Sequence, residues 1–535
     1  MPLLYRNLLL PLGIDESHLP DRLARQLGLA PEEILDFSVI RKGIDARRKG
    51  QILFVYTVQF AVADENALLN RSGDNRDLVA VPAETPRQFP CLTASQRIVI
   101  VGTGPAGLFA ALRLAEYGLT ATLIERGKPV ADRVRDVQLF WSRGQLDPES
   151  NVQFGEGGAG TFSDGKLTTR VRDENIGYVL DRLVAFGAPP EIRYLAKPHI
   201  GTDRLRTVVG SLRRYLEERG MRVLFGQRLT DLVTGSGRLR GVIVNDATEF
   251  PCDALILAPG HSARDTYEML ERRGVMLESK PFAVGVRVEH PQELINRIQY
   301  GLSSHPQLPA ADYALAYNDL QSGRSAYSFC MCPGGVVVAG ASEAGGVVTN
   351  GMSSQLRNSP FANSALVVTV GRNDFPDGSP LAGIRFQQEL ERSAFKAGGS
   401  DYRAPAQNLL AFLGEPGGGP VRTTYLPGVR SASLDELLPP YVTTTLRDGI
   451  RSFNRKMRGF ITAEATLIGV ESRTSAPVRI VRGSDLQSAS LGGLYPAGEG
   501  AGYAGGIMSA ALDGIKVADA IAAGLLDGAP PHTLP

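Results

Sequence analysis

Three glycines with fixed spacing are the clearest chemical signal in the sequence. Gly102, Gly104 and Gly107 directly follow the apolar run of residues 97–101 and stand where a helix would begin. In such a turn the first glycine permits a tight bend, the second lets the backbone approach a pyrophosphate, and the third lets the helix pack closely on the strand. Amide groups at the helix N-terminus then face the phosphates. The spacing predicts a dinucleotide-binding turn.

Four further residues belong to the same predicted site. Glu125 lies 125 − 102 = 23 positions after Gly102, at the end of the next predicted strand. A carboxylate in this position can bind a ribose diol. Pro105, Ala106 and Arg126 adjoin these residues, and we expect them to contact the cofactor as well.

A second glycine-rich segment runs from Gly155 to Lys166 and holds five glycines in twelve residues. Glycine loses more conformational freedom on folding than any other residue, so this loop is costly to order. Close approach of its backbone to a ligand would explain that cost. We therefore assign Gly157, Gly158 and Lys166 to the cofactor site, and a flexible surface loop is the alternative.

Two segments of the chain carry a resemblance to a known group of flavoproteins. Residues 98–127 (IVIVGTGPAGLFAALRLAEYGLTATLIERG) resemble the first motif of the FAD-binding glutathione-reductase-type flavoproteins. Residues 254–260 (ALILAPG) are similar to the strand that ends in Ala-Thr-Gly in those proteins, with Pro259 in place of the threonine. The resemblance implies that Gly260 lies at the FAD site.

The C-terminal region contains the last part of this resemblance. Residues 494–499 (LYPAGE) occupy the place of a Gly-Asp motif whose acid binds the ribityl chain of the flavin, and here the acid is a glutamate. Residues 505–507 then open a helix whose N-terminus can face the flavin and stabilise its anionic reduced form. The resemblance implies FAD as the cofactor. In this region it assigns five residues to FAD: Gly498, Glu499, Gly505, Gly506 and Ile507.

Six segments together resemble the bacterial family usually called uncharacterised FAD-dependent dehydrogenases. They are residues 155–167, 197–209, 280–291, 330–335, 349–353 and 471–480. The resemblance covers nearly the whole chain. It implies an FAD-dependent dehydrogenase or reductase with a small ferredoxin-like N-terminal module, and it implies no particular substrate.

Three residues are our candidates for catalysis: His199, Arg473 and Tyr503. His199 precedes a predicted helix N-terminus, which favours the neutral imidazole that a base needs, and a histidine bound to backbone is the alternative. Arg473 can clamp a substrate carboxylate through its planar fork or pair with Glu471. Tyr503 can donate a proton or cover the flavin. His261, next to Gly260, either lies near the FAD or starts the connection that leaves the sheet.

The elements that must position these residues follow an α/β pattern. Two apolar runs, 97–101 and 121–125, are joined by a predicted helix at 107–117, and parallel pairing requires such a crossover. We predict a discontinuous, doubly wound, Rossmann-like FAD-binding domain with an inserted α+β substrate domain. The predicted parts are a small α+β module (1–90), a linker (81–96), the first part of the FAD-binding domain (97–262), the inserted substrate domain (263–480) and the second part of the FAD-binding domain (481–535).

The N-terminal module is predicted to have two strands, at residues 8–10 and 52–62. Between them the pattern predicts two short amphipathic helices, at 19–27 and 31–37. The basic residues of 41–49 could contact nucleic acid. Since the module carries as many acids as bases, we interpret them as a solvated turn.

Composition excludes several classes of protein. With 57 Lys and Arg against 56 Asp and Glu, the net charge is +1, which disfavours a nucleic-acid partner that would need a basic surface. The four cysteines, Cys91, Cys252, Cys330 and Cys332, lack metal-ligand spacing, so we expect no metal site and a reducing compartment. Cys330 and Cys332 could form a redox pair, but we expect them to be buried structural residues. Without a signal peptide or a membrane-spanning run, we expect a soluble cytoplasmic protein.

Our leading hypothesis is an FAD-dependent oxidoreductase that transfers hydride between an unknown small organic substrate and N5 of the flavin. We find no second GxGxxG turn in a βαβ unit, so electrons come from the substrate, from transiently bound NAD(P)H or from a protein partner. An FAD-dependent monooxygenase is one alternative, and a non-catalytic or RNA-associated flavoprotein is another. The sequence leaves the oligomeric state open.

Overall fold

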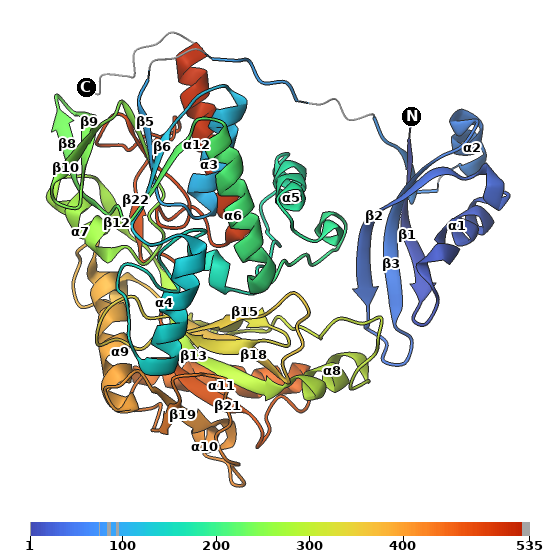
Figure 1. The fold of residues 1–535 in the computed structure, drawn as a ribbon. Coiled ribbons are helices and arrows are strands. Elements are labelled where there is room, and N and C mark those ends of the chain that lie inside the picture. Colours follow the sequence, from blue (N-terminus) through green and yellow to red (C-terminus); the bar gives the residue numbers. More distant parts are fainter. Residues whose placement is uncertain (1, 74, 83–86, 93–95, 527–535) are drawn as a thin grey trace.

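A computed structural model describes residues 2–73, 75–82, 87–92 and 96–526 of the chain. Figure 1 shows a small N-terminal module, a nucleotide-binding region and a second large region below it. The predicted linker at 81–96 lies only partly within the described residues. The final residues of the predicted 481–535 segment, from 527 onward, lie outside them as well.

The N-terminal module is a four-stranded antiparallel sheet with two helices, in the chain order βαββαβ of ferredoxin-like folds. Leucine, valine and aromatic side chains from the sheet and helices form its own core. Its elements are β1 (Leu3–Pro11), α1 (Leu19–Leu27), β2 (Leu35–Asp45), β3 (Leu53–Ala61), α2 (Glu65–Ser72) and β4 (Leu78–Ala80).

One predicted helix of this module is wrong. Only Pro31–Glu33 forms a helical turn, and strand β2 begins at Leu35. A helix of seven residues gains little from its own backbone, whereas β2 pairs with β3 along nearly its whole length. The basic residues Arg41 and Lys42 therefore lie in a strand, where Lys42 also forms backbone hydrogen bonds with Tyr194 and Ala196 of the nucleotide-binding region.

The nucleotide-binding region is built on a five-stranded parallel sheet. The chain adds β6 and β7 on one side of β5 and then returns to place β11 on the other side, so the strand order reverses between β5 and β11. Ligands bind at such switch points in open α/β sheets. In order across the sheet the strands are β23 (Leu494–Pro496), β11 (Ala254–Leu257), β5 (Ile98–Val101), β6 (Thr122–Glu125) and β7 (Arg222–Phe225).

Alternate residues of these strands face two different cores. Ile98 and Ile100 of β5 pack beneath helices, whereas Val99 and Val101 pack on the other face. The helices on the first face are α3 (Pro105–Glu116), α5 (Ile176–Ala185), α6 (Thr202–Glu218) and α12 (Ile507–Leu526). The second face is covered by β8 (Leu229–Gly235), β9 (Arg238–Val244), β10 (Thr248–Pro251) and α7 (Arg264–Arg272).

The second large region contains a seven-stranded sheet in which all neighbouring pairs are antiparallel except β19 and β20. Its chain leaves the nucleotide-binding region after β11 and returns to it before β23. In order across the sheet the strands are β14 (Ala316–Asn318), β15 (Ser325–Cys332), β18 (Phe361–Val370), β13 (Phe282–Pro291), β21 (Thr466–Glu471), β19 (Ala404–Asn408) and β20 (Val429–Ser431).

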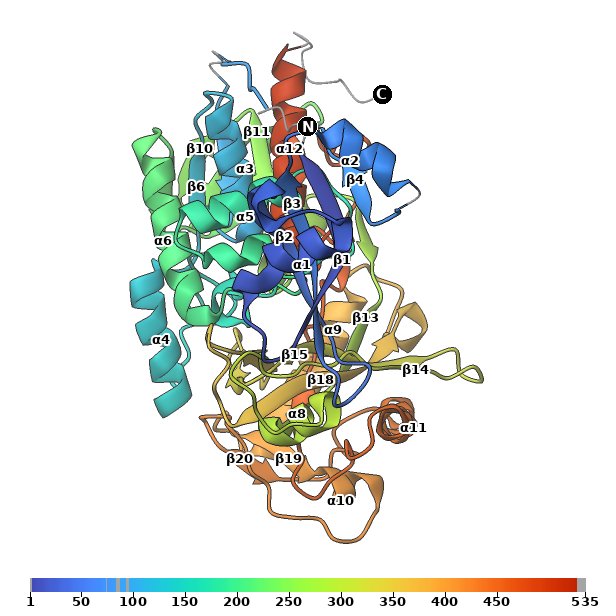
Figure 2. The ribbon, with the colours of Figure 1, turned by 90° about the vertical axis from the view of Figure 1, so that its right-hand side faces the viewer.

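Helices and a small pair of strands complete this region, as Figures 1 and 2 show. The largest core of the protein lies between the seven-stranded sheet and its helices. The helices are α4 (Val130–Arg143), α8 (Gln292–Tyr300), α9 (Ala382–Gly398), α10 (Leu409–Leu413) and α11 (Pro440–Lys456). The small pair is β16 (Val336–Ala339) with β17 (Thr349–Met352). A second small pair, β12 (Leu277–Ser279) with β22 (Val478–Ile480), belongs to the core on the second face of the five-stranded sheet. None of the described helices is long and apolar enough to cross a membrane.

Candidate active site

A cavity of about 360 Å³ lies where the five-stranded and seven-stranded sheets meet. Loops that follow β5, β6 and β11 line one side of it, and residues of β15 and β21 line the other. Most residues that the sequence assigns to the cofactor line this cavity: Gly102, Gly104, Pro105, Ala106, Glu125, Arg126, Gly158, Lys166, Gly260, Gly498, Glu499, Gly505, Gly506 and Ile507. Gly107 and Gly157 are not among the lining residues.

The turn after β5 needs glycine for two different reasons. Gly102 has φ +94°, and a Cβ there would stand 2.2 Å from the carbonyl oxygen of Ala258. A Cβ on Gly107 would stand 2.0 Å from the carbonyl oxygen of Gly102. These contacts agree with the predicted tight bend and the close packing of α3 on β5. Gly104 precedes α3 and faces the cavity, where the helix N-terminus favours a phosphate.

Glu125 has a different environment from the one its position predicts. Its Oε2 accepts hydrogen bonds from the amide (2.9 Å) and the hydroxyl (2.8 Å) of Thr103. Its Oε1 accepts from the amides of Gly127 and Gly155, both at 3.0 Å. A carboxylate has about four acceptor sites, and these bonds use all of them. Glu125 therefore ties three loops together at the rim of the cavity, and its contact with a ribose stays a prediction.

The neighbouring Arg126 is also held by the protein. Its guanidinium group pairs with Glu149 (2.8 Å) and Asp265 (2.9 Å) and lies 4.1 Å from the ring centre of Phe154. Burial of Arg126 is offset by these two carboxylates, which raise its pKa. The group is thus a fixed positive charge at the cavity wall.

The glycine-rich loop approaches the first turn closely. A Cβ on Gly158 would stand 3.0 Å from the Cα of Gly104, and the amide of Gly157 donates to the carbonyl oxygen of Thr103 at 2.9 Å. Gly157 itself faces the side chains of Thr161 and Val209. Part of the glycine content therefore serves contact between two loops, and Gly158 is the member of this pair that borders the cavity.

Three other glycines leave room on the cavity side. A Cβ on Gly260, Gly505 or Gly506 would meet no protein atom within 4 Å, although all three border the cavity. Helix α12 begins at Ile507, so its N-terminus faces the same space. The three glycines leave space next to a helix N-terminus, which favours a large anionic cofactor. Gly260, Gly505, Gly506 and the start of α12 therefore fit FAD.

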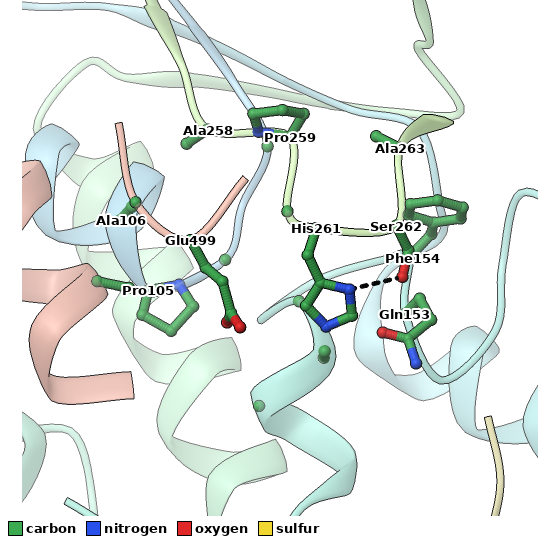
Figure 3. A pocket seen from close by; sticks show the side chains of 18 of the residues that line it. Pro105, Ala106, Gln153, Phe154, Ala258, Pro259, His261, Ser262, Ala263 and Glu499 are labelled. Atoms are coloured by element: carbon green, nitrogen blue, oxygen red, sulfur yellow. Dashed lines mark hydrogen bonds between the residues drawn. The ribbon is translucent and has the colours of Figure 1, made fainter. Parts of the chain in front are cut away.

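Glu499 projects into the cavity, and its side chain has no hydrogen-bond partner among the residues that the structure describes (Figure 3). Burial, with a smaller contribution from Cys330, raises its pKa to about 7, and Lys280 opposes this shift. Glu499 can therefore exchange a proton near neutral pH.

His261 faces the same space as Glu499 (Figure 3). Its Nδ1 lies 2.9 Å from the hydroxyl oxygen of Ser262, which accepts a hydrogen bond from Nη1 of Arg473 at 3.0 Å. A guanidinium group has only donors, so Ser262 accepts from Arg473 and keeps its own proton to donate, for which His261 Nδ1 is an acceptor within reach. Burial and the nearby Arg473 and Arg264 lower the pKa of His261 to about 3. The lowered pKa favours the neutral ring, and when Ser262 donates to Nδ1 the ring proton is on Nε2.

Comparison with known proteins shows the family to which the chain belongs. It is 46% identical over 532 residues to a protein of Clostridium beijerinckii described as "Uncharacterized protein", covering 97% of this chain and 98% of that one. Residues 97–157 match the family described as FAD binding domain, and residues 281–474 match FAD-dependent protein, C-terminal domain-like. The chain belongs to a family of FAD-dependent proteins. FAD is its cofactor. Residues 4–61 match a domain of unknown function (DUF8436).

Solved structures give more distant likenesses. The chain of the flavin-dependent brominase Bmp2 is 13% identical with a TM-score of 0.36, over 81% of this chain and 79% of that chain. CtdE in complex with FAD is 11% identical with a TM-score of 0.29, over 80% of this chain and 84% of that chain. Neither structure is similar enough to this chain to indicate its activity.

Two of the predicted catalytic residues lie outside the cavity lining of the FAD-dependent protein. His199 Nε2 lies 2.9 Å from the carbonyl oxygen of Gln355, and burial followed by Arg357 lowers its pKa. It is thus bound to backbone, which is the alternative interpretation. The Tyr503 hydroxyl accepts from the amide of Arg482 at 3.2 Å, and its ring lies under the guanidinium groups of Arg482 and Arg479. Both side chains contact other parts of the protein, neither is among the residues that line the cavity, and their catalytic roles stay predictions.

Arg473 borders the cavity, but its side chain is largely used by the protein. It donates to Glu391 through Nε (3.0 Å) and Nη2 (2.8 Å), and to Ser262 and Ser342 through Nη1. The predicted pairing with Glu471 is absent, because Glu471 pairs with Arg287. Arg473 therefore positions Ser262, and its role as a substrate clamp stays a prediction.

Lys166 and Cys330 complete the wall on the side of the seven-stranded sheet. Among the described residues no carboxylate lies within ion-pair distance of Lys166, so its charge is available to a bound molecule. Cys332 is buried, as expected, but Cys330 is only partly buried and borders the cavity. No local pattern of residue types indicated this position, because Cys330 lies in a bulge of β15. No group of three His, Cys, Asp or Glu within the described part of the chain could hold a metal ion.

Proposed function

We propose that this protein is an FAD-dependent oxidoreductase that transfers a hydride between a small organic substrate and N5 of the flavin. One observation supports the proposal most: a single cavity joins the nucleotide-binding loops to titratable side chains of the seven-stranded sheet. The residues at 263–480 would then supply the substrate side, because pockets between two domains are common sites for small molecules.

Bound FAD would supply the two-electron chemistry, and the chain would supply placement and proton transfer. Glu499 and His261 face each other across the cavity, and they differ in how readily they titrate (Figure 3). Glu499 can give or take a proton near pH 7, whereas neutral His261 can donate a fixed hydrogen bond from Nε2. The Lys166 ammonium group can stabilise negative charge on a bound molecule.

The first test is the visible spectrum of the purified protein, followed by NADH or NADPH without oxygen. We expect flavin absorbance that is lost on reduction by a chemical reductant. Rapid loss with NADH or NADPH would identify a nicotinamide-fed enzyme, whereas persistence would identify a substrate dehydrogenase or an enzyme reduced by a protein partner. A protein that takes up no FAD on reconstitution would overturn the proposal.

A His261→Ala variant tests the proposed site directly. We expect it to keep FAD and to lower the rate of flavin reduction by substrate or nicotinamide by roughly 100-fold, the low end of what a positioned proton-transfer or hydrogen-bonding group contributes. Tyr503→Phe, a change outside the cavity lining, serves as the control. Equal rates for the two variants would contradict the assignment of His261.

A further inference from the structure

Two cysteines meet at a bulge in the wall of the cavity. From Phe329 to Cys332 strand β15 takes three steps, whereas its partner β18 takes only two, from Ala365 to Asn363. One extra residue is thus inserted on β15, which breaks the regular alternation of side chains. Bulges of this kind re-aim side chains and are frequent beside active sites. Here the bulge contains Cys330.

The backbone of Cys330 is held in an unusual conformation. Its φ is +44°, in the left-handed region that residues other than glycine rarely adopt. The carbonyl oxygen of Cys330 accepts a hydrogen bond from Nη1 of Arg287 at 3.2 Å. Arg287 is fully buried and is fixed by Glu471 and Asn363. A buried, fully paired arginine therefore anchors the bulge.

The Cys332 thiol points toward the backbone of Cys330 in the bulge. Its Sγ donates to the carbonyl oxygen of Cys330 at 3.3 Å. Two glycines make room for this side chain: a Cβ on Gly351 would stand 2.9 Å from Cys332 Sγ, and a Cβ on Gly335 would stand 3.0 Å from Cys332 Cβ. A hydrogen bond between the two thiols lowers the pKa of Cys330. The Cys332 thiol thus lies directly against Cys330.

The two members of the pair differ in access. Cys330 borders the cavity beside Phe329, whereas Cys332 is completely buried. Lys166 and Arg287 place positive charge near Cys330, with Glu471 opposing them. Positive surroundings and partial exposure characterise reactive cysteines, and a buried neighbouring thiol can complete a disulfide.

We propose that Cys330 and Cys332 are a redox-active dithiol that exchanges two electrons with FAD and, through Cys330, with an external thiol compound. The two S–H bonds break and one S–S bond forms, which releases two electrons and two protons. Both electrons and one proton would pass to oxidised FAD bound in the cavity, and the second proton would pass to solvent. An external dithiol then reduces the S–S bond by exchange and leaves as a disulfide. The inference rests on the proposed oxidoreductase function and assigns thiols as its substrate class.

The first experiment needs no flavin. The apoprotein is treated with a thiol oxidant, diamide, then denatured and alkylated, and the alkylated cysteines are counted by mass spectrometry. The chain has four cysteines, so a Cys330–Cys332 disulfide would lower the count from four to two, with the loss confined to the peptide that holds both residues. Four alkylated cysteines, or a loss elsewhere, would overturn the proposal.

The second experiment uses the holoprotein without oxygen and dithiothreitol as the external dithiol. We expect flavin absorbance to be lost at least about tenfold faster in the wild type than in Cys330→Ser or Cys332→Ser, because only the wild type can pass electrons by exchange. Cys91→Ser removes an exposed cysteine outside the cavity lining and should behave as the wild type. Equal rates in the wild type and the Cys330 and Cys332 variants would overturn the dithiol.

Folding and cofactor binding are controlled within the same experiment. Each variant must show the flavin spectrum and lose it with dithionite, and Cys330→Ala provides a second replacement if the serine variant fails to take up FAD. A protein that binds FAD but shows no effect of the cysteines refutes the dithiol alone. A wild-type protein that binds no FAD refutes the proposed oxidoreductase function.

Discussion

The two sides of the cavity differ in composition: one is formed mainly by backbone, and the other by charged side chains. On the nucleotide-binding side, backbone amides and glycines such as Gly102 and Gly158 set the shape, and Glu125 is bound mainly by main-chain amides. On the opposite side, charged side chains are buried and paired with one another. Glu391 is 2% exposed and pairs with Arg473 at 2.8 Å and with Arg264, at the start of α7 in the nucleotide-binding region, also at 2.8 Å.

Because the two sides differ in this way, different kinds of mutation should damage them. A surface made of backbone is damaged when atoms are added to it, because a new Cβ meets a neighbouring main chain. A surface made of buried ion pairs is damaged when a charge is removed, because the partner is left unpaired in a medium of low polarity. Mutations that add bulk and mutations that remove charge should therefore act on opposite sides of the cavity.

The largest expected effect comes from removing the shared carboxylate of the charged side. Glu391→Gln keeps the size of the side chain but leaves Arg473 without a counter-charge and Arg264 with Glu343 alone, at 3.0 Å, and we expect a loss of about 3–5 kcal/mol in the free energy of unfolding. Urea unfolding followed by circular dichroism measures it. Asp377→Asn, which breaks the exposed pair with Arg385, is the control and should cost at most about 0.5 kcal/mol. Equal losses would show that the charged side does not depend on pairing.

The next largest effect tests the backbone side. Gly104→Val places methyl groups between the first turn and Gly158, which lies 3.8 Å from the position of a Cβ on Gly104. We expect FAD affinity to fall roughly 10- to 100-fold, the equivalent of a cost of about 1–3 kcal/mol for crowding, with little loss of folding stability. Fluorescence titration of the apoprotein with FAD measures the affinity.

Gly210→Val is the matched control for this change. Gly210 lies within α6, and a Cβ there would meet no atom within 4 Å. This variant should keep wild-type affinity for FAD. A Gly104→Val protein that folds and retains full affinity would refute the role of the turn.

A smaller effect is expected from the carboxyl group that faces the cavity. The pKa of Glu499 is raised from 4.5 to about 7 by burial. The folded protein therefore holds this proton over a pH range in which the unfolded chain has released it, so its contribution to stability is lost as pH rises from about 4.5 to about 7 and stays lost above.

Thermal unfolding of the apoprotein at pH 5 and pH 8 tests this prediction. We expect Glu499→Gln to gain stability over the wild type at pH 8 but not at pH 5, by no more than about 2 kcal/mol because the carboxyl group borders a cavity. Glu415→Gln changes an exposed carboxyl and is the control. A gain of equal size at both pH values would contradict the assigned titration.

The smallest effect is expected at Tyr503, which lies outside the cavity lining and tests where the site ends. Tyr503→Phe removes one hydrogen bond, from the amide of Arg482, and keeps the ring under the arginine side chains. We expect a cost of about 1 kcal/mol in stability and no change in FAD affinity or in the rate of flavin reduction. Stopped-flow reduction beside a thermal melt measures both. A large loss of rate at unchanged stability would return Tyr503 to the catalytic candidates.

Local patterns accounted for much of the fold and for one side of the site. The Gly102, Gly104 and Gly107 spacing predicted the turn after β5 and the helix that follows, because these constraints act within a few residues of each other. The helix predicted to begin just after His199 is α6, which begins at Thr202. The helix expected at 31–37 was wrong because pairing with a distant strand outweighed a weak local preference.

For the catalytic candidates, the neighbouring residues in the sequence did not show which side chains face the cavity. His199 and Tyr503 have suitable chemistry and suitable neighbours in sequence, but tertiary contacts with Gln355 and Arg482 engage them elsewhere. His261 was left open between two interpretations, and Cys330 was expected to be structural. Only the position of each side chain relative to the cavity separates these cases.

Short spacings and composition were enough to predict a dinucleotide turn, to show a resemblance to FAD-dependent proteins and to give a net charge close to zero. These properties depend on short spacings and on composition. The tertiary structure alone decided which side chains share the cavity, because its charged wall joins distant parts of the chain: Arg264 meets Glu391 across 127 positions, and Arg287 meets Glu471 across 184. Burial, pairing and access are set by these long-range contacts, and no local pattern of residue types encodes them.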